Sequence, residues 1–428
     1  MAGSDIRKTV FSDRALPWLF FFTTSGYYLI MLIMFELGFN SQSRLFTVPV
    51  RLLTVVIGII IISKQRTILQ KDRLFAFLCI YVFAYYLTRM VYDLNFQGFH
   101  YFMGSSEYYL YTISHFGLPL FFMTATFSLE AWQKSKHYVL KAAVFVSVLG
   151  FIFYRERFAQ GYGRLKGVDE EDIILSPLAI SYVCLVPLAY YSFELLKGNF
   201  TKKKLLTSLV YISLSMLGVF MGASRGSILA YILVIVILSL AKGYKARLLV
   251  FTGILALILP VVVSLSNDFG SSLFDRVLHT VDETKTGKYL ENDRPYLWKN
   301  AIENFSNSPI LGDLIENRGI GHHPHNIIIE AFMAMGVLGG IPFVILLGLV
   351  FKYLFYIAKR TNTFDWLLIF FLLSFSQNMV SGSIWSAVWL WTASGSIIGI
   401  YYQIKYKNVY KINSDFTRDS TGVPKTAI

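Results

Sequence analysis

The chain has 428 residues, of which 55% are hydrophobic, 17% aromatic and only 15% charged, and its mean hydropathy is +0.54. This composition excludes a soluble fold of this size and indicates that lipid is the solvent. The formal net charge of +13 would suggest nucleic-acid binding in a soluble protein. Here the charges lie mostly between apolar runs, so we expect a lipid bilayer and no nucleic acid as partner.

Apolar runs of about 20 residues, the length that crosses a bilayer core of roughly 30 Å, recur along almost the whole chain. They predict helices, because a barrel would show short alternating segments instead. The predicted fold class is an all-α integral membrane protein with about twelve transmembrane helices. We place these spans at Leu16–Gly38, Phe46–Ser63, Leu74–Tyr92, Tyr109–Ala131, Val139–Tyr154, Ile173–Leu196, Leu205–Ala223, Ser227–Ala241, Leu248–Ser266, Val337–Ile357, Trp366–Val380 and Ile384–Gln403.

The spans divide the chain into four parts. Residues 1–266 hold the first nine helices, 267–336 form one long and mostly helical loop, 337–403 hold the last three helices, and 404–428 form a polar tail. We expect the tail to be disordered after Asn413 and the first span to remain uncleaved. Cys79 and Cys184 lie inside apolar runs, where packing is the expected role.

Lysines and arginines gather in every second connection. They precede the first span at Arg7, Lys8 and Arg14, and they recur in the stretches Lys64–Arg73, Lys134–Lys141, Lys197–Lys204, Lys242–Arg247, Lys352–Arg360 and Lys405–Lys411. The positive-inside rule therefore predicts cytoplasmic termini and places the long loop on the outer face of the membrane.

The long loop contains predicted helices on both sides of an irregular stretch. Leu273–Val281 has an amphipathic pattern, and Leu297, Ala301, Ile302 and Phe305 form an apolar stripe behind Pro295. The stretch 306–323 is rich in Asn, Pro and Gly, which favours loop. A helix is predicted from Asn326, with Ile329, Phe332 and Gly336 on the same face as His325. Gly336, Gly339 and Gly340 would let it bend or pack closely.

Arg225 is the most informative single residue, because it occupies a very short outer turn where the positive-inside preference disfavours arginine. It is either an interface arginine with its charge at the membrane surface or a fixed cation for a phosphate arriving from the outer leaflet. Arg294 opens the second loop helix, where it is either a phosphate ligand or a solvated partner of Asp293.

His325 lies at the predicted start of the helix that returns to the membrane, in the sequence Gly-His-His-Pro-His-Asn. A helix N-terminus attracts anions and disfavours imidazolium, so neutral His325 is a candidate base beside a bound phosphate. The neighbouring His322 and His323 raise the alternative of a zinc site, but no fourth ligand is evident, and we predict neither metal nor cofactor.

Other polar features have ordinary explanations. The acidic run 169–172 precedes a span, where helix capping is the default and divalent-metal binding the alternative. Asp313, Glu316 and Asn317 are interpreted as structural polar residues of the loop. Aromatic residues near span ends, Trp385 among them, fit an interfacial belt better than a sugar-stacking surface. Charges within spans, Arg51 among them, lie near the span ends, which argues against an ion-coupled transporter.

Several of these residues together resemble a known family. His325-Asn326, nine residues and then Gly336-Val337-Leu338-Gly339 resembles the His-Asn-x9-Gly-x-x-Gly signature of bacterial O-antigen ligases and the related polymerases. Arg225 with Leu229 fits the Arg-x-x-x-Leu element of that family, and Arg294 through Trp298, followed by Pro309 and Gly312, resembles its loop. The resemblance covers about the C-terminal half of the chain.

The resemblance implies a GT-C-like, metal-independent, inverting glycosyltransferase of the bacterial inner membrane, with a periplasmic active site. Its donor would be a glycan linked to undecaprenyl diphosphate, and its acceptor either lipid A-core or another lipid-linked glycan. Arg225 and Arg294 would hold the diphosphate, with Asn326 and Arg318 as further contacts to diphosphate or glycan. His325 would remove the proton from the acceptor hydroxyl or orient that hydroxyl.

The sequence leaves the acceptor open. Ligase activity on lipid A-core is the first hypothesis, and polymerisation of lipid-linked repeats of O-antigen or another surface polysaccharide is the alternative. A more distant alternative is a non-enzymatic polysaccharide flippase or transporter, in which polar residues would thread several spans.

Overall fold

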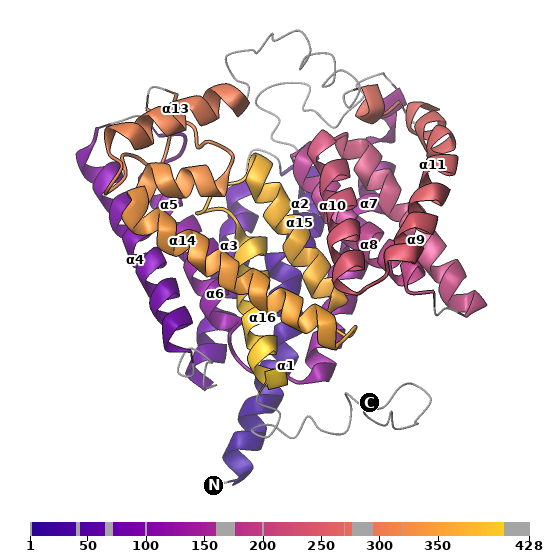
Figure 1. Cartoon of the computed structure of the whole chain (residues 1–428), viewed down its shortest axis with the longest axis horizontal. Helices are drawn as coiled ribbons and strands as arrows, with labels where there is room; N and C mark the ends of the chain where they lie inside the picture. The colour runs from indigo at the N-terminus through magenta and orange to yellow at the C-terminus, as the bar shows by residue number, and fades with distance from the viewer. Residues whose placement is uncertain are drawn as a thin grey trace.

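The computed structural model describes residues 2–39, 43–64, 72–98, 101–159, 176–198, 201–268, 270–275, 294–318 and 320–405. Within these ranges the regular structure is helical and contains no strand. The helices in chain order are α1 (Ala2–Thr23), α2 (Ser25–Glu36), α3 (Ser43–Lys64), α4 (Arg73–Phe96), α5 (Ser105–Tyr111), η3 (Thr112–Gly117), α6 (Leu118–Phe122), α7 (Leu129–Ala159), α8 (Pro177–Leu196), α9 (Lys202–Gly222), α10 (Arg225–Ala241), α11 (Lys245–Asp268), α13 (Arg294–Asn307), α14 (Ile327–Arg360), α15 (Asp365–Ser381) and α16 (Val388–Lys405) (Figure 1).

Among the described residues, seven helices are long and apolar enough to cross a membrane, namely α3, α4, α7, α8, α9, α11 and α14. Helices α1 and α2 add an eighth span when they are counted together, although they are bent by 53° at Thr24. Helices α10 and α15 are apolar but shorter. The helices are those of a multi-pass membrane protein, and the predicted number of twelve spans stays a prediction.

The fourth predicted span, Tyr109–Ala131, is not one regular α-helix, and its helical part ends at Phe122, earlier than predicted. Its residues form the end of α5, the π-helix η3 and the short helix α6, and the chain then turns before α7 begins at Leu129. Gly117 and Pro119 lie where these pieces join, and such residues interrupt a regular helix. One consequence is that Lys134, Lys136 and Lys141, predicted in a connection, lie within α7.

Helix α16 packs closely against α6 and the segment that follows it. A Cβ atom on Gly395 would lie 2.5 Å from the carbonyl oxygen of Leu120, and one on Gly399 would lie 2.8 Å from that of Met123. Small residues four positions apart let two backbones approach closely. In a membrane, dispersion contacts rather than exclusion of water hold helices together, so this close approach is stabilising. Helix α16 is consequently buried along almost its whole length.

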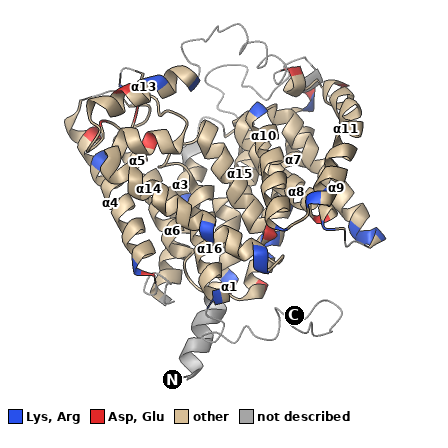
Figure 2. Ribbon diagram, in the orientation of Figure 1, with Lys and Arg blue, Asp and Glu red and all other residues tan. Residues whose placement is uncertain are grey.

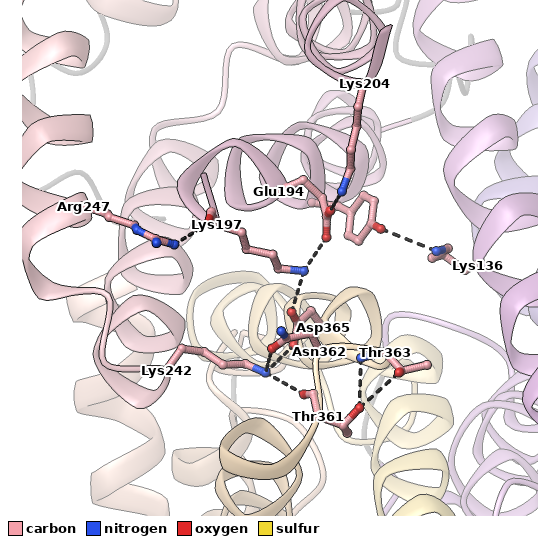
Figure 3. A network of polar contacts seen from close by, with 11 residues as sticks. Lys136, Glu194, Lys197, Lys204, Lys242, Arg247, Thr361, Asn362, Thr363 and Asp365 are labelled. Carbon is pink, nitrogen blue, oxygen red and sulfur yellow. Dashed lines mark hydrogen bonds and ion pairs between the residues drawn. The ribbon is translucent and has the colours of Figure 1, made fainter. Parts of the chain in front are cut away.

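Two sides of the molecule differ in charge. The loop side carries α13 and the segment 308–326, and the opposite lysine side carries the ends of α8 and α10 and the start of α15 (Figures 1 and 2). On the lysine side, the carboxylate of Asp365 is fully buried and forms ion pairs of 2.8 Å with both Lys197 and Lys242 (Figure 3). Glu194 pairs with Lys197 and, at 2.8 Å, with Lys204. Two of the predicted basic connections, Lys197–Lys204 and Lys242–Arg247, therefore meet on one side.

We expect Asp365→Asn to lower the free energy of unfolding by about 3 kcal/mol, because it leaves two largely buried lysines without a shared carboxylate. The thermal midpoint of the purified protein in nanodiscs measures the effect. Glu303→Gln is the matched control, since Glu303 and its partner Lys299 are exposed and 3.8 Å apart, and such pairs contribute about 0 to 1 kcal/mol. Equal midpoints for the two variants would contradict a stabilising role for Asp365.

Parts of the sequence predictions fall outside the described residues, namely the acidic run 169–172, residues 276–281 of the first loop helix and the tail after residue 405. The second loop helix is confirmed as α13. Leu297 and Ala301 are buried there, and Phe305 packs edge-on against Phe332 at 5.9 Å. Ile302 was predicted in the same apolar stripe, but its side chain is 54% exposed because it points away from α14.

Candidate functional site

The loop that precedes the histidines is fixed to α14 by backbone contacts at a break in that helix. Gly336 lies inside α14 with φ +58° and ψ −161°, a conformation that is essentially restricted to glycine. The N–H of Val337 donates to the carbonyl of Pro309 at 2.8 Å, and the N–H of Asp313 donates to that of Met333 at 2.8 Å. The bend expected near Gly336 is confirmed, and it provides the binding surface for residues 309–313.

His325 lies just outside α14 and not on its surface. Its φ is +57°, a left-handed conformation that is uncommon for residues other than glycine. His325 was predicted on the same helical face as Ile329, Phe332 and Gly336, but it precedes the N-cap Asn326 and its backbone is not helical, so helical spacing does not place it there. Strain of this kind costs roughly 1 to 3 kcal/mol and persists only where the surroundings hold it.

Asn326 is the residue that holds this geometry. Its Oδ1 accepts hydrogen bonds from the N–H groups of Ile328 and Ile329, at 3.0 and 3.1 Å, and so caps α14. Its Nδ2 donates to the carbonyl of Met379 near the end of α15, at 3.1 Å. Both ends of the amide thus have protein partners, and the arrangement favours a positioning role for Asn326.

The three histidines form a compact cluster. The ring centroids of His323 and His325 are 4.3 Å apart, and His322 lies 6.0 Å from His325. Burial lowers the pKa of His325 to about 4, with help from the positive charge of Arg294, and burial lowers that of His323 to about 3. Both imidazoles are neutral at pH 7. Within the described ranges, no group of three or more His, Cys, Asp or Glu residues is arranged to hold a metal ion.

Arg225 reaches the same region from α10. A Cβ atom on the adjacent Gly226 would lie 3.4 Å from the side chain of Val380 in α15. Val380 directly follows Met379, whose carbonyl accepts the hydrogen bond from Asn326. The start of α10 and the start of α14 therefore meet at the last turn of α15. The spacing of these residues in the sequence does not predict this contact.

Arg294 completes the group electrostatically. It is the first residue of α13, and its charge acts on both His325 and the hydroxyl of Tyr182. A Cβ atom on Gly226 would lie 3.4 Å from that hydroxyl. Arg225, Arg294 and His325 thus each stand at or beside the first turn of a helix, where the helix dipole adds to the attraction for an anion.

Arg318, predicted as a further substrate contact, has a protein partner. Its Nε lies 2.9 Å from Oδ2 of Asp313, and Nη2 contacts the other carboxylate oxygen. This two-point contact joins the docked loop 309–313 to the segment leading to the histidines. Asn317 acts similarly, donating from Nδ2 to the carbonyl of Leu297 at 3.2 Å. The interpretation of Asp313 and Asn317 as structural loop residues is confirmed.

Two buried carboxylates lie near the histidines, and one of them, Glu330, was not singled out from the sequence. Glu330 is fully buried in the first turn of α14, and its carboxylate accepts hydrogen bonds from the hydroxyls of Tyr86 and Ser383, at 2.8 and 2.7 Å. Glu316 accepts from the N–H of Phe102 at 3.1 Å and from the hydroxyl of Tyr108, and burial raises its pKa to about 6. Glu330 was detectable only as an acid in an otherwise apolar run.

We expect His325 to titrate near pH 4, well below its ordinary value of 6.5, in NMR spectra of histidine-labelled protein in nanodiscs. The unfolded chain binds this proton more readily, so the stability contributed by neutral His325 is present above pH 6.5 and is lost as the pH falls toward 4. Arg294→Gln should raise this pKa because it removes a positive charge, whereas Lys299→Gln, an exposed change in the same helix, should not. A wild-type titration near pH 6.5 would contradict the buried neutral imidazole.

Residues 210–312 match the family model described as O-antigen ligase. The matched segment contains Arg225 and Arg294 and ends at Gly312, the glycine that packs against the backbone of α14. This finding confirms the family resemblance that the motifs indicated. No curated protein sequence matches the chain.

Proposed function

Since the chain carries a segment of the O-antigen ligase family, which is a family of glycosyltransferases, we propose that it transfers a glycan from undecaprenyl diphosphate to an acceptor hydroxyl. The observation that carries this proposal is the convergence of Arg225, Arg294 and neutral His325 around the last turn of α15. Two arginines and several helix starts suit a diphosphate, and a neutral imidazole beside them suits a hydroxyl.

In the proposed reaction, the acceptor oxygen attacks the anomeric carbon while the bond from that carbon to the diphosphate oxygen breaks. Attack from the opposite face inverts the configuration. Arg225 and Arg294 offset the charge that grows on the leaving diphosphate, a role that needs no metal ion. His325 accepts the proton of the attacking hydroxyl or orients that hydroxyl, for which its low pKa keeps it in the neutral form.

We further propose that the loop side faces the periplasm and the lysine side the cytoplasm of a bacterial inner membrane. Lys197 and Lys204 of one connection and Lys242 of another lie on one side and support this orientation, because basic residues are retained on the cytoplasmic side. The donor then enters laterally from the outer leaflet, and both chain termini are cytoplasmic.

The acceptor is tested by reconstitution of the full chain in liposomes with an undecaprenyl-diphosphate glycan. Lipid A-core is offered in one set of vesicles and a second lipid-linked repeat in another. A single product on lipid A-core supports the proposed ligase, whereas a ladder of lengthening lipid-linked chains supports the polymerase alternative. Movement of the lipid-linked glycan across the bilayer without any transfer would overturn the enzymatic proposal in favour of a flippase.

A further inference from the structure

A cavity lined by both polar and apolar residues lies apart from the three histidines. Its volume is about 490 Å³, and it is enclosed by α2, α3, the α5 and η3 segment, the start of α8, the end of α15 and the residues before α16. We call it the Arg51 cavity, after the arginine of α3 that lines it. Its size is in the range of cavities that bind small molecules or single sugar units.

Arg51 is a buried cation that contacts two tyrosine hydroxyls and pairs with no carboxylate among the described residues. Only 9% of its surface is exposed. Its Nη2 donates to the hydroxyl of Tyr111 at 2.6 Å and to that of Tyr27 at 3.3 Å, and its guanidinium carbon lies 4.0 Å from the ring centroid of Tyr111. Its Nε is buried and has no hydrogen-bond partner. None of the ion pairs between described residues includes Arg51, although Glu107 lines the same cavity.

A charge in this position indicates a ligand. Removing a guanidinium from water is costly unless an opposite charge compensates it, and ionisable residues inside membrane proteins commonly mark binding sites or transport paths. The two most deeply buried lysines of the lysine side that form ion pairs, Lys197 and Lys242, share the carboxylate of Asp365. Arg51 instead lines a cavity and has a donor without a partner among the described residues, which favours an anion from outside the chain as its partner.

The wall opposite Arg51 adds an independent observation. Residues 112–117 form the π-helix η3, and such segments occur frequently at functional sites. His115 of η3 lines the cavity, its ring lies edge-on to Tyr111 at 4.8 Å, and its Nδ1 is buried without a hydrogen-bond partner among the described residues. The wide turn therefore places a second unsatisfied polar side chain on the same cavity.

The Arg51 cavity shares a wall with the candidate active site. Asn378 and Ser381 of α15 line the cavity, whereas Met379 and Val380 of the same turn contact Asn326 and the position of Gly226. The ring of Trp385 bridges the two regions, with centroid distances of 5.4 Å to Tyr111 and 5.9 Å to His323. A ligand in the cavity would thus lie against the same turn of α15 that carries Met379 and Val380.

We infer that the Arg51 cavity is an oxyanion-binding subsite that holds an acidic group of a substrate at a distance from the reacting bond. The group is a carboxylate on a sugar unit or a phosphate, and Arg51 would bind it with His115 and the tyrosine hydroxyls around it. The identification of the ligand as part of the glycan substrate rests on the proposed function. The binding of an oxyanion at Arg51 does not.

The test measures binding without transfer. The full chain in nanodiscs is titrated with sodium glucuronate, inorganic phosphate, inorganic pyrophosphate or glucose, and the thermal midpoint is followed. We expect saturable stabilisation by at least one oxyanion and none by glucose. Stabilisation by glucuronate alone identifies a sugar carboxylate as the ligand chemistry, and stabilisation by phosphate or pyrophosphate that persists in Arg225→Gln/Arg294→Gln identifies a phosphate.

Variants locate the site of binding. The response should persist in Arg225→Gln/Arg294→Gln and weaken at least about tenfold in Arg51→Gln, since a hydrogen bond to a charged group is worth about one factor of ten or more. Arg360→Gln is the matched control, because its guanidinium lies 4.1 Å from the ring centroid of Tyr356 but is exposed at the other end of α14. Ala179→Trp keeps Arg51 and obstructs the cavity, so it should weaken binding even if Arg51→Gln does not fold.

The proposal is overturned if no oxyanion stabilises the wild type, or if the response disappears with Arg225 and Arg294 and survives in Arg51→Gln. Failure of the proposed glycan transfer would appear separately, as absence of product in the liposome assay with oxyanion binding unchanged.

Discussion

Arg225→Lys is expected to lower the rate of glycan transfer by about 100- to 1,000-fold while the amount of folded protein stays the same, as happens when one preorganised donor to a developing anion is lost. Lysine keeps the charge but loses the planar pair of donors that matches a phosphate, so the variant separates geometry from charge. Arg225 is the first residue of α10 and only partly buried, which makes the exchange compatible with folding. Product formation in the reconstituted assay, normalised to protein in the membrane, gives the rate.

The histidine needs a different substitution. His325 has φ +57°, and asparagine tolerates this conformation better than alanine, so His325→Asn removes the base while sparing the backbone. Transfer should fall by about 100-fold or more if His325 accepts the proton, and less if it only orients the hydroxyl. Arg360→Lys, at an exposed position near the opposite end of α14, should leave transfer unchanged. Full activity in both Arg225→Lys and His325→Asn would refute the assigned roles.

The sequence predicted the helices best where one apolar run makes one regular helix. Helices α3, α4, α8, α9 and α11 begin and end within a few residues of their predicted bounds. The run Tyr109–Ala131 looked equally apolar, but hydropathy does not report whether the backbone keeps its hydrogen-bond pattern, and η3 departs from it. A count of apolar residues could consequently predict neither the π-helix nor the cavity beside it.

The candidate site was predictable in its residues and not in its assembly. The odd position of Arg225 and the family motif selected three of its members, but their meeting point at the end of α15 depends on tertiary packing. Asn326 belongs to the same motif, yet its amide is used within the protein as a helix cap. A motif preserves positioning residues and reacting residues alike, and only contacts distinguish the two. Arg51 carried no motif, and its isolation from carboxylates is visible only in three dimensions.

Gly336→Ala is expected to lower the free energy of unfolding by about 4 kcal/mol or more. The amount of folded protein in the membrane should fall strongly as a result. A Cβ atom at this position would lie 2.3 Å from the carbonyl oxygen of Ile310 and 2.6 Å from the amide nitrogen of Gly312, and both are backbone atoms that cannot rotate away. The backbone angles at Gly336 are also closed to alanine. Relief by straightening α14 would break the hydrogen bonds from Val337 and Asp313.

The matched control is Gly348→Ala, twelve residues further along the same helix, where a Cβ atom would meet nothing within 4 Å. There the change should be neutral or stabilising by about 1 kcal/mol, as expected for glycine to alanine in a regular helix. Thermal midpoints and membrane abundance measure both variants, and hydrogen exchange at the N–H of Asp313 reports whether the loop 309–313 has left α14. If Gly336→Ala matched Gly348→Ala in all three measurements, the break in α14 would not be what fixes the loop. If a variant still folds but its loop 309–313 leaves α14, Arg318 and the histidine segment should move with the loop, because Asp313 of the loop pairs with Arg318. Transfer would then be lost although Arg225, Arg294 and His325 were all present.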